Sequence, residues 1–212
     1  MLEQLEEIAK HYETILLDTC VLFMPLTSSP RISIQEKIKH SNRITNSAIF
    51  FTEQFQNSGN FQVTHSVIEE YSPKTFSLKK RVKQKFVQGN RNELRWYRTI
   101  MRENKERRRL INVFEEKDMV FKLDKIKKEI YNYFRKIYSG FEEMRKLDET
   151  DLDFLISGLT IFDKNTSCLL ISNDFQIMYA WRKIVLTQKL DSKNFGFYFR
   201  KQFNGFEKAY GD

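Results

Sequence analysis

Two apolar runs that lie far apart in the chain both end on an aspartate, and together they constrain the fold more than any other feature. The first run, TILLD, ends at Asp18, and the second, CLLISND, ends at Asp174. Short apolar runs of this kind are typical of strands that are buried on both faces of a sheet. Ligands of open α/β sheets bind at the carboxyl ends of the strands. The two runs therefore predict an acidic, metal-binding pocket at one edge of a sheet.

The rest of the apolar pattern alternates between helical and strand-like spacing. Ser33 is a suitable N-cap for a long helix, Pro73 ends a shorter helix, and Pro25 and Pro30 indicate a loop over residues 24–33. Helices are expected at residues 3–12, 34–57, 66–71, 149–162 and 175–182, and strands at residues 14–19, 61–64, 167–172, 184–187 and 195–199. Strands that alternate with helices predict an α/β fold with a parallel sheet covered on both faces.

The middle of the chain follows a different pattern. Residues 75–146 contain almost no Gly or Pro and many good helix formers, which predicts two or three long helices with a break near residues 115–118. Helices this polar are not expected to lie wholly inside a core built on a sheet. We therefore predict one domain formed by residues 1–73 and 147–212, with residues 74–146 inserted as a basic helical arm.

Positive charge is concentrated in the predicted arm. The chain has 36 Lys and Arg against 28 Asp and Glu, a formal net charge of +8. Residues 74–109 contain fourteen Lys and Arg against Glu93, Glu103 and Glu106, a local balance of +11 that leaves −3 for the remainder. A charged run is often only the solvated face of a helix, but one dominated by a single sign indicates contact with a polyanion such as nucleic acid.

The composition excludes several other classes of protein. With 7 Gly among 212 residues, the chain has no Gly-rich phosphate loop, which argues against P-loop and dinucleotide chemistry. Its two cysteines, Cys20 and Cys168, fall in expected strands and are interpreted as buried, small apolar residues in a reducing compartment. The acidic, amphipathic start differs from a signal peptide, and no apolar run is long enough to cross a bilayer. We expect a cytoplasmic protein without membrane contact.

Four acids stand at the ends of expected elements. Asp18 and Asp174 follow strands, Asp151 begins a helix, and Glu70 lies in the helix after the second strand. Any one of them alone is explained as a helix cap or an exposed helix residue. Together they suggest a cation site, because clustered carboxylates repel one another unless a cation neutralises them. Ligands that are all oxygen suit Mg²⁺ or Mn²⁺ rather than Zn²⁺.

Four segments resemble, in order, the acidic motifs of PIN-domain ribonucleases: LLDTCVL, VTHSVIEEY, LDETDLDFLISGL and LLISNDFQI. The resemblance covers about residues 14–71 and 147–187 and leaves the basic middle unexplained. It implies a three-layer α/β/α sandwich with a central, mostly parallel sheet. It also implies a Mg²⁺- or Mn²⁺-dependent endoribonuclease that hydrolyses RNA phosphodiester bonds. The implied catalytic and metal-binding carboxylates are Asp18, Glu70, Asp151 and Asp174.

Doubled acids leave a choice at two of these positions. The family's second acid precedes an apolar residue, which selects Glu70 before Tyr71 and leaves Glu69 as the alternative. Asp153 lies about 200° from Asp151 on a helix, so the two cannot both face one pocket. The family pattern selects Asp151 and leaves Asp153 on the surface. The residues beside the first and last acids, expected to hydrogen-bond the metal ligands, are Thr19, Ser172 and Asn173.

RNA contact is expected along one face of a helix in the arm. The residues interpreted as backbone contacts recur every three or four positions: Arg91, Arg95, Arg98 and Arg102. Trp96 and Tyr97 lie among them and are suited either to stacking on bases or to packing. Backbone contacts carry no sequence preference. The substrate therefore stays open between structured RNA, such as tRNA or rRNA precursors, and the target of a ribonuclease toxin from a toxin–antitoxin pair.

Other functions remain to be separated from this one. A phosphatase with an aspartyl nucleophile needs a second Asp two residues after the first, where Cys20 stands. A receiver-like domain leaves the basic segment unexplained. A catalytically silent PIN-like scaffold that binds RNA or oligomerises through its arm stays open, as do a homo-oligomer and a small antitoxin-like protein partner.

Overall fold

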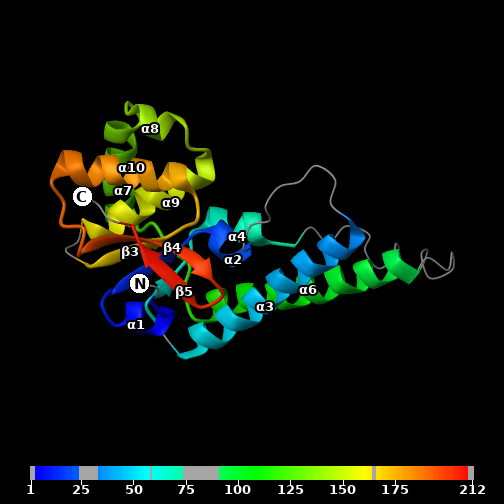
Figure 1. Ribbon diagram of the computed structural model, residues 1–212. Coiled ribbons are helices and arrows are strands. Elements are labelled where there is room, and N and C mark those ends of the chain that lie inside the picture. Colours follow the sequence, from blue (N-terminus) through cyan, green and yellow to red (C-terminus); the bar gives the residue numbers. More distant parts are fainter. Residues whose placement is uncertain (1–2, 24–32, 58, 74–90, 164–165, 210–212) are drawn as a thin grey trace.

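A five-stranded sheet brings the two apolar runs next to each other (Figure 1). The computed structural model describes residues 3–23, 33–57, 59–73, 91–163 and 166–209. The strands lie in the order β2-β1-β3-β4-β5. Their bounds are β1 (Thr14–Leu17), β2 (Phe61–Gln62), β3 (Cys168–Ile171), β4 (Phe195–Gln202) and β5 (Gly205–Lys208).

Parallel pairing places the ends of β1 and β3 at the same edge of the sheet. β1 pairs in parallel with β2 and β3, β3 pairs in parallel with β4, and β5 returns antiparallel to β4 in a hairpin. Leu17 is in register with Ile171, so Asp18 and Ser172 are the next residues at this edge. The chain goes from β1 to β2 on one side and later to β3 on the other, so the strand order reverses between β1 and β3. Open α/β sheets bind their ligands at such a point.

Helices cover both faces of this sheet. The helices in the described part of the chain are α1 (Leu5–Ala9), α2 (Thr19–Phe23), α3 (Ile34–Asn57), α4 (His65–Tyr71), α6 (Arg91–Glu116), α7 (Lys125–Tyr138), α8 (Glu142–Arg145), α9 (Glu149–Phe162) and α10 (Phe175–Gln188). Ile15 and Leu17 belong to one core cluster with residues of α1, α2, α3, α4 and α6. Leu16 belongs to the other cluster, with α7, α9 and α10. Because successive strand residues face opposite sides, β1 is apolar and buried at nearly every position.

The long helices α3 and α6 run side by side in the same direction and project from the sheet (Figure 1). Toward their outer ends, the Lys37 ammonium lies 5.0 Å from the centre of the Trp96 ring. Near the sheet, the Phe55 ring lies 5.3 Å from the Phe114 ring. Both phenylalanines are buried in the same core cluster as Ile15. The helix pair is therefore anchored at its inner end by the sheet's own core.

The predicted N-cap of α3 is confirmed. The Ser33 backbone N–H and hydroxyl both donate to Glu36 Oε2 at 2.8 Å, and the Glu36 N–H donates to Ser33 Oγ at 3.2 Å. This reciprocal arrangement is a capping box. The α4 helix was expected at residues 66–71 but begins one residue earlier, at His65, because the Thr64 hydroxyl caps it by accepting from the Val67 N–H.

The predicted break in the middle of the chain lies between α6 and α7 and is confirmed. Within it, the Val63 N–H donates to the Met119 carbonyl at 3.0 Å, and the Phe121 N–H donates to the Val63 carbonyl at 2.8 Å. Residues 119–121, which belong to the segment expected to be an inserted arm, thus pair with the chain just after β2 at the edge of the sheet. Residues 74–90 of that segment lie outside the described residues, and the domain boundaries stay a prediction.

Three expectations about local structure were wrong. Residues 184–187 belong to α10 rather than to a strand, because Ile184 continues the buried helical face that contains Ile177 and Trp181. The strand β5 was missed, since its short sequence GFEK carries little alternation. Cys20 lies in α2 and not in a strand. No helix within the described ranges is long and apolar enough to cross a membrane.

Candidate functional site

Asp18 is the most buried of the four predicted acids, with 3% of its surface exposed. Its Oδ1 accepts from the Thr19 N–H at 2.6 Å. Its Oδ2 accepts from the Ser172 hydroxyl at 2.6 Å and from the Cys20 thiol at 2.7 Å. Burial raises the pKa of Asp18, and these hydrogen bonds only partly oppose the rise. The ionised carboxylate therefore lies in an environment that favours its neutral form.

The Ser172 hydroxyl connects Asp18 to Asp174. It donates to the Asp18 carboxylate and accepts from the Asp174 N–H at 3.0 Å. The Asp174 side chain caps α10, where its Oδ1 accepts from the Gln176 N–H at 2.6 Å. The two acids that follow β1 and β3 thus share one bridging residue at the point where the strand order reverses. Asp174 also has an ordinary structural role as a helix cap.

Asp151 lies in the first turn of α9, where Asp148 is the N-cap and accepts from the Asp151 N–H at 2.9 Å. Its pKa is raised to about 7, first by burial and then by the negative charges of Asp148, Asp18, Asp174 and Glu70. Like charges shift a carboxyl group in this way only when they lie near it. The repulsion therefore links Asp151 with all three of the other predicted acids.

Glu70 lies in the last turn of α4 and is exposed. Its charge contributes to the raised pKa values of both Asp18 and Asp151. Glu69, the alternative at this position, contributes to neither. Of the two neighbouring glutamates, Glu70 is the one whose charge acts on the other acids.

Asp153 is not the surface residue that helical geometry predicted. Its Oδ1 accepts from the Tyr131 hydroxyl at 2.9 Å, and its Oδ2 accepts from the Ser66 hydroxyl. The side chain is therefore partly buried and ties α9 to both α4 and α7. The angle of about 200° from Asp151 does separate the two acids, but the far side of α9 is covered by helices whose position the sequence pattern did not reveal.

The residues beside the acids have distinct contacts. Thr19 binds Asp18 through its backbone N–H, while its buried hydroxyl has no hydrogen-bond partner in the described part of the chain. Asn173 accepts from the Arg200 N–H at 2.8 Å through its side chain and donates to Cys20 Sγ at 3.0 Å through its backbone. The sequence predicts Cys20 as a buried, small apolar residue, whereas its thiol donates to the Asp18 carboxylate. Its position two residues after Asp18 is the signal that could have revealed its contact with that carboxylate.

The acids suit a hard divalent cation in kind, because they supply oxygen ligands that repel one another. The unpartnered Thr19 hydroxyl beside Asp18 is a further oxygen at this place. Across the described residues, however, no three His, Cys, Asp or Glu side chains are grouped closely enough to hold a metal ion. The oxygen donors are of the kind that Mg²⁺ or Mn²⁺ binds, and they comprise the buried Asp18, the partly exposed Asp151 and Asp174, and the exposed Glu70.

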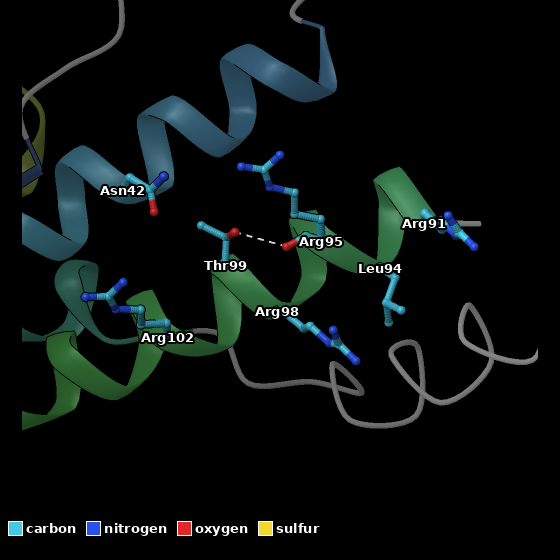
Figure 2. A pocket seen from close by; sticks show the side chains of 7 residues that line it. All are labelled: Asn42, Arg91, Leu94, Arg95, Arg98, Thr99 and Arg102. Carbon is cyan, nitrogen blue, oxygen red and sulfur yellow. Dashed lines mark hydrogen bonds between the residues drawn. The ribbon is translucent and has the colours of Figure 1, made fainter. Parts of the chain in front are cut away.

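All four arginines predicted to bind RNA line one open hollow of about 380 Å³ on α6, next to α3. Figure 2 shows Arg95 extending toward α3, whereas Arg91 and Arg98 point away from it. Each of the four is exposed. The basic segment also has interior members: Arg107 is 9% exposed and donates to the Tyr71 carbonyl at 2.9 Å and to Glu103 at 3.2 Å. Part of the charge run is therefore structural.

The raised pKa of Asp151 gives a pH-dependent prediction for the metal-free protein. Because the pKa is higher in the folded chain than the ordinary 3.8, the contribution of Asp151 to stability is fully present below about pH 4 and is lost as the pH rises through about 7. We expect Asp151→Asn to raise the melting temperature more at about pH 8 than at about pH 5, measured by calorimetry in chelator. An equal rise at both pH values would contradict the repulsion assigned to Asp151.

The site thus consists of a buried Asp18, bridged by Ser172 to Asp174, with Asp151 and Glu70 close enough to repel them. The exposed arginines lie on a separate helix that projects from the sheet. Comparison of the chain with protein-family models, with curated proteins and with solved structures found no match.

Proposed function

We propose that this chain is a metal-dependent endoribonuclease of the PIN-domain type, with a three-layer α/β/α fold. The observation that carries the proposal is the Ser172 hydroxyl, which joins Asp18 and Asp174 where the strand order reverses. That is the usual ligand position in an open α/β sheet. The repulsion among Asp151, Asp18, Asp174 and Glu70 supports a cation at the same place. The order of the four acidic motifs supports the choice of family.

In this proposal each acid has a defined task. Asp18 and Asp174 hold the principal Mg²⁺ or Mn²⁺, and Ser172 fixes the orientation of the Asp18 carboxylate. Glu70 and Asp151 complete the site or orient the attacking water. The bound ion supplies a more acidic water and shields the charge that develops on the phosphodiester. Structured RNA, including tRNA or rRNA precursors, is the proposed substrate class.

The function is tested by cleavage of labelled structured and unstructured RNAs in Mg²⁺, in Mn²⁺ and in chelator. We expect the RNA strands to be cut internally in Mg²⁺ or Mn²⁺ and to stay intact in chelator. RNA binding without cleavage in every condition would instead support a second function, a catalytically silent scaffold. The observation that favours this second function is that the described acids are not already grouped around a metal position.

The arginines on α6 give a prediction about binding. Reversing the charge of both Arg95 and Arg98 to Glu should weaken RNA affinity strongly and reduce its dependence on salt, because each lost phosphate contact lowers the slope of log affinity against log salt by about 0.7 to 0.9. Affinity is measured by fluorescence anisotropy between about 50 and 200 mM salt.

The matched control is the double variant Lys125→Glu, Lys128→Glu. Both lysines are exposed on α7, away from the hollow. These changes alter net charge equally, so they report the non-specific part of the effect. If both double variants weaken binding to the same extent, α6 has no special part in holding RNA.

A further inference from the structure

A second hollow, here called the tryptophan pocket, lies between α3, the end of α4 and α6. Its volume is about 510 Å³. Lys37, His40 and Ile44 line it from α3, Trp96 and Ile100 from α6, and Glu70 from α4. Because Glu70 is also one of the four acids, the pocket opens next to the proposed catalytic site.

Trp96 gives this pocket a flat aromatic wall. Its indole is partly exposed and is backed by the Tyr97 ring at 5.0 Å between centroids. The exposed Lys37 ammonium lies 5.0 Å from the ring centre. An exposed ammonium on an aromatic ring is held only weakly, and a stacked nucleobase binds such a ring more strongly. A base can therefore displace Lys37 from the ring.

His40 adds a polar group of the kind that reads the edge of a heterocycle. Its Nδ1 is buried and has no hydrogen-bond partner among the described residues. Burial lowers the pKa of His40 below its usual value, so the ring is neutral at pH 7 and has one donor and one acceptor nitrogen. Ile44 and Ile100 supply apolar walls. Glu103 and Arg107 also line the pocket, but both are buried and pair with each other at 3.2 Å. Together with Glu70 they leave no excess of positive charge to hold a phosphate, whereas the flat aromatic and apolar walls suit a nucleobase.

We propose that the tryptophan pocket binds one unpaired base of the RNA next to the bond that is cut, with the base stacked on Trp96. The displaced Lys37 ammonium then pairs with a phosphate of the same strand. A base held in a duplex cannot enter, because its faces are already stacked on its neighbours. The inference rests on the proposed function and adds that the enzyme selects single-stranded segments.

Tryptophan fluorescence tests the pocket without requiring cleavage. The chain has two tryptophans, and Trp181 is fully buried, so a change caused by bound RNA reports on Trp96. The full chain carrying Asp18→Asn, in chelator, is titrated with a single-stranded oligoribonucleotide of about eight nucleotides and with the matched blunt duplex. We expect quenching by the single strand and little by the duplex.

Affinity measurements then separate stacking from folding effects. By anisotropy of the labelled single strand, Trp96→Ala should weaken binding about tenfold or more, and Trp96→Phe should restore most of the loss. Tyr133→Ala, an exposed aromatic residue on α7, serves as the matched control and should leave affinity unchanged. Absence of quenching, or equal affinities for wild type and Trp96→Ala, would overturn the pocket.

The two proposals fail separately in these experiments. If the wild type cleaves RNA, but RNA does not quench Trp96 fluorescence and Trp96→Ala does not change affinity, the nuclease proposal is supported and the base pocket is contradicted. If single strands quench Trp96 but no RNA is cut in any metal, the pocket stands and the protein is a binding scaffold. Equal quenching by single strand and duplex would remove the selectivity for unpaired bases.

Discussion

Replacing Asp18 by Asn will abolish metal-dependent cleavage of RNA and leave the chain as stable as wild type, or more so. The amide keeps the shape of the carboxylate: its oxygen can still accept from the Thr19 N–H, and its NH₂ group takes the place of Oδ2 and can donate to the Ser172 hydroxyl. It removes the negative charge that a cation needs. In the proposed function Asp18 is a direct metal ligand, so its loss should reduce activity by more than the roughly 10- to 100-fold that is usual for residues that contact the ligands.

The expected gain in stability follows from the environment of Asp18. Burial raises the pKa of this carboxyl group, and the charge of Glu70 raises it further. At neutral pH the ionised form therefore opposes folding, and a neutral isostere relieves that cost. Activity and stability should change in opposite directions, as they often do at functional sites.

Asp153→Asn is the matched control for Asp18→Asn. Asp153 is an acid next to the site, but it accepts from Tyr131 and Ser66 and holds three helices together. We expect this variant to keep most of its cleavage and to lose stability. Cleavage rates and melting temperatures of the two variants are measured side by side. If Asp18→Asn cleaves at the wild-type rate, the site assignment is wrong.

Phe55→Ala will cause the largest loss of stability that we predict from a single substitution. The ring is fully buried and contacts three other rings, at 5.3 Å to Phe51, 4.7 Å to Phe61 and 5.3 Å to Phe114. These contacts join α3, β2 and α6. Truncating a buried Phe costs about 3–5 kcal/mol of unfolding free energy, which in a chain of this size lowers the melting temperature by roughly 6–20 °C.

Tyr133→Ala is the matched control, since Tyr133 is 62% exposed on α7. Its removal should change the unfolding free energy by less than about 0.5 kcal/mol. Urea denaturation of both variants gives the comparison. A loss below about 1 kcal/mol for Phe55→Ala would mean that the inner end of the α3–α6 pair does not depend on this aromatic cluster.

The sequence predicted the central strands well because their signal is local. Each of the runs ending at Asp18 and Asp174 is a short, continuous apolar segment, and its shortness and polar borders favour a strand over a buried helix. The apolar run at residues 184–187 gave the same signal but continues α10, because periodicity alone does not separate the two. The α9 helix was predicted with its observed bounds, since Asp148 is a good cap and the following residues are apolar. The antiparallel β5 was missed because four residues, two of them polar, carry too little pattern.

Contacts between segments far apart in the chain could not be predicted from the sequence. Nothing in the run from Arg91 to Glu116 indicated that its first half would lie along α3 and that Phe114 would enter the core of the sheet. The partners of Asp153 come from residues 22 and 87 positions away. The same holds for the tryptophan pocket, whose walls come from three helices. Helical periodicity gives the apolar face of a helix but not its neighbour.

The parallel course of α3 and α6 has an electrostatic consequence. Antiparallel neighbours cancel each other's dipoles, whereas the partial positive charges at the N-termini of these two helices add. Glu36 and Glu93, the acids in their first turns, offset this field, and Glu36 also closes the capping box. These two carboxylates therefore stabilise the helices and also weaken the attraction of a polyanion to the same end. Removing them should increase the affinity of this end for RNA and decrease the stability of the helix pair.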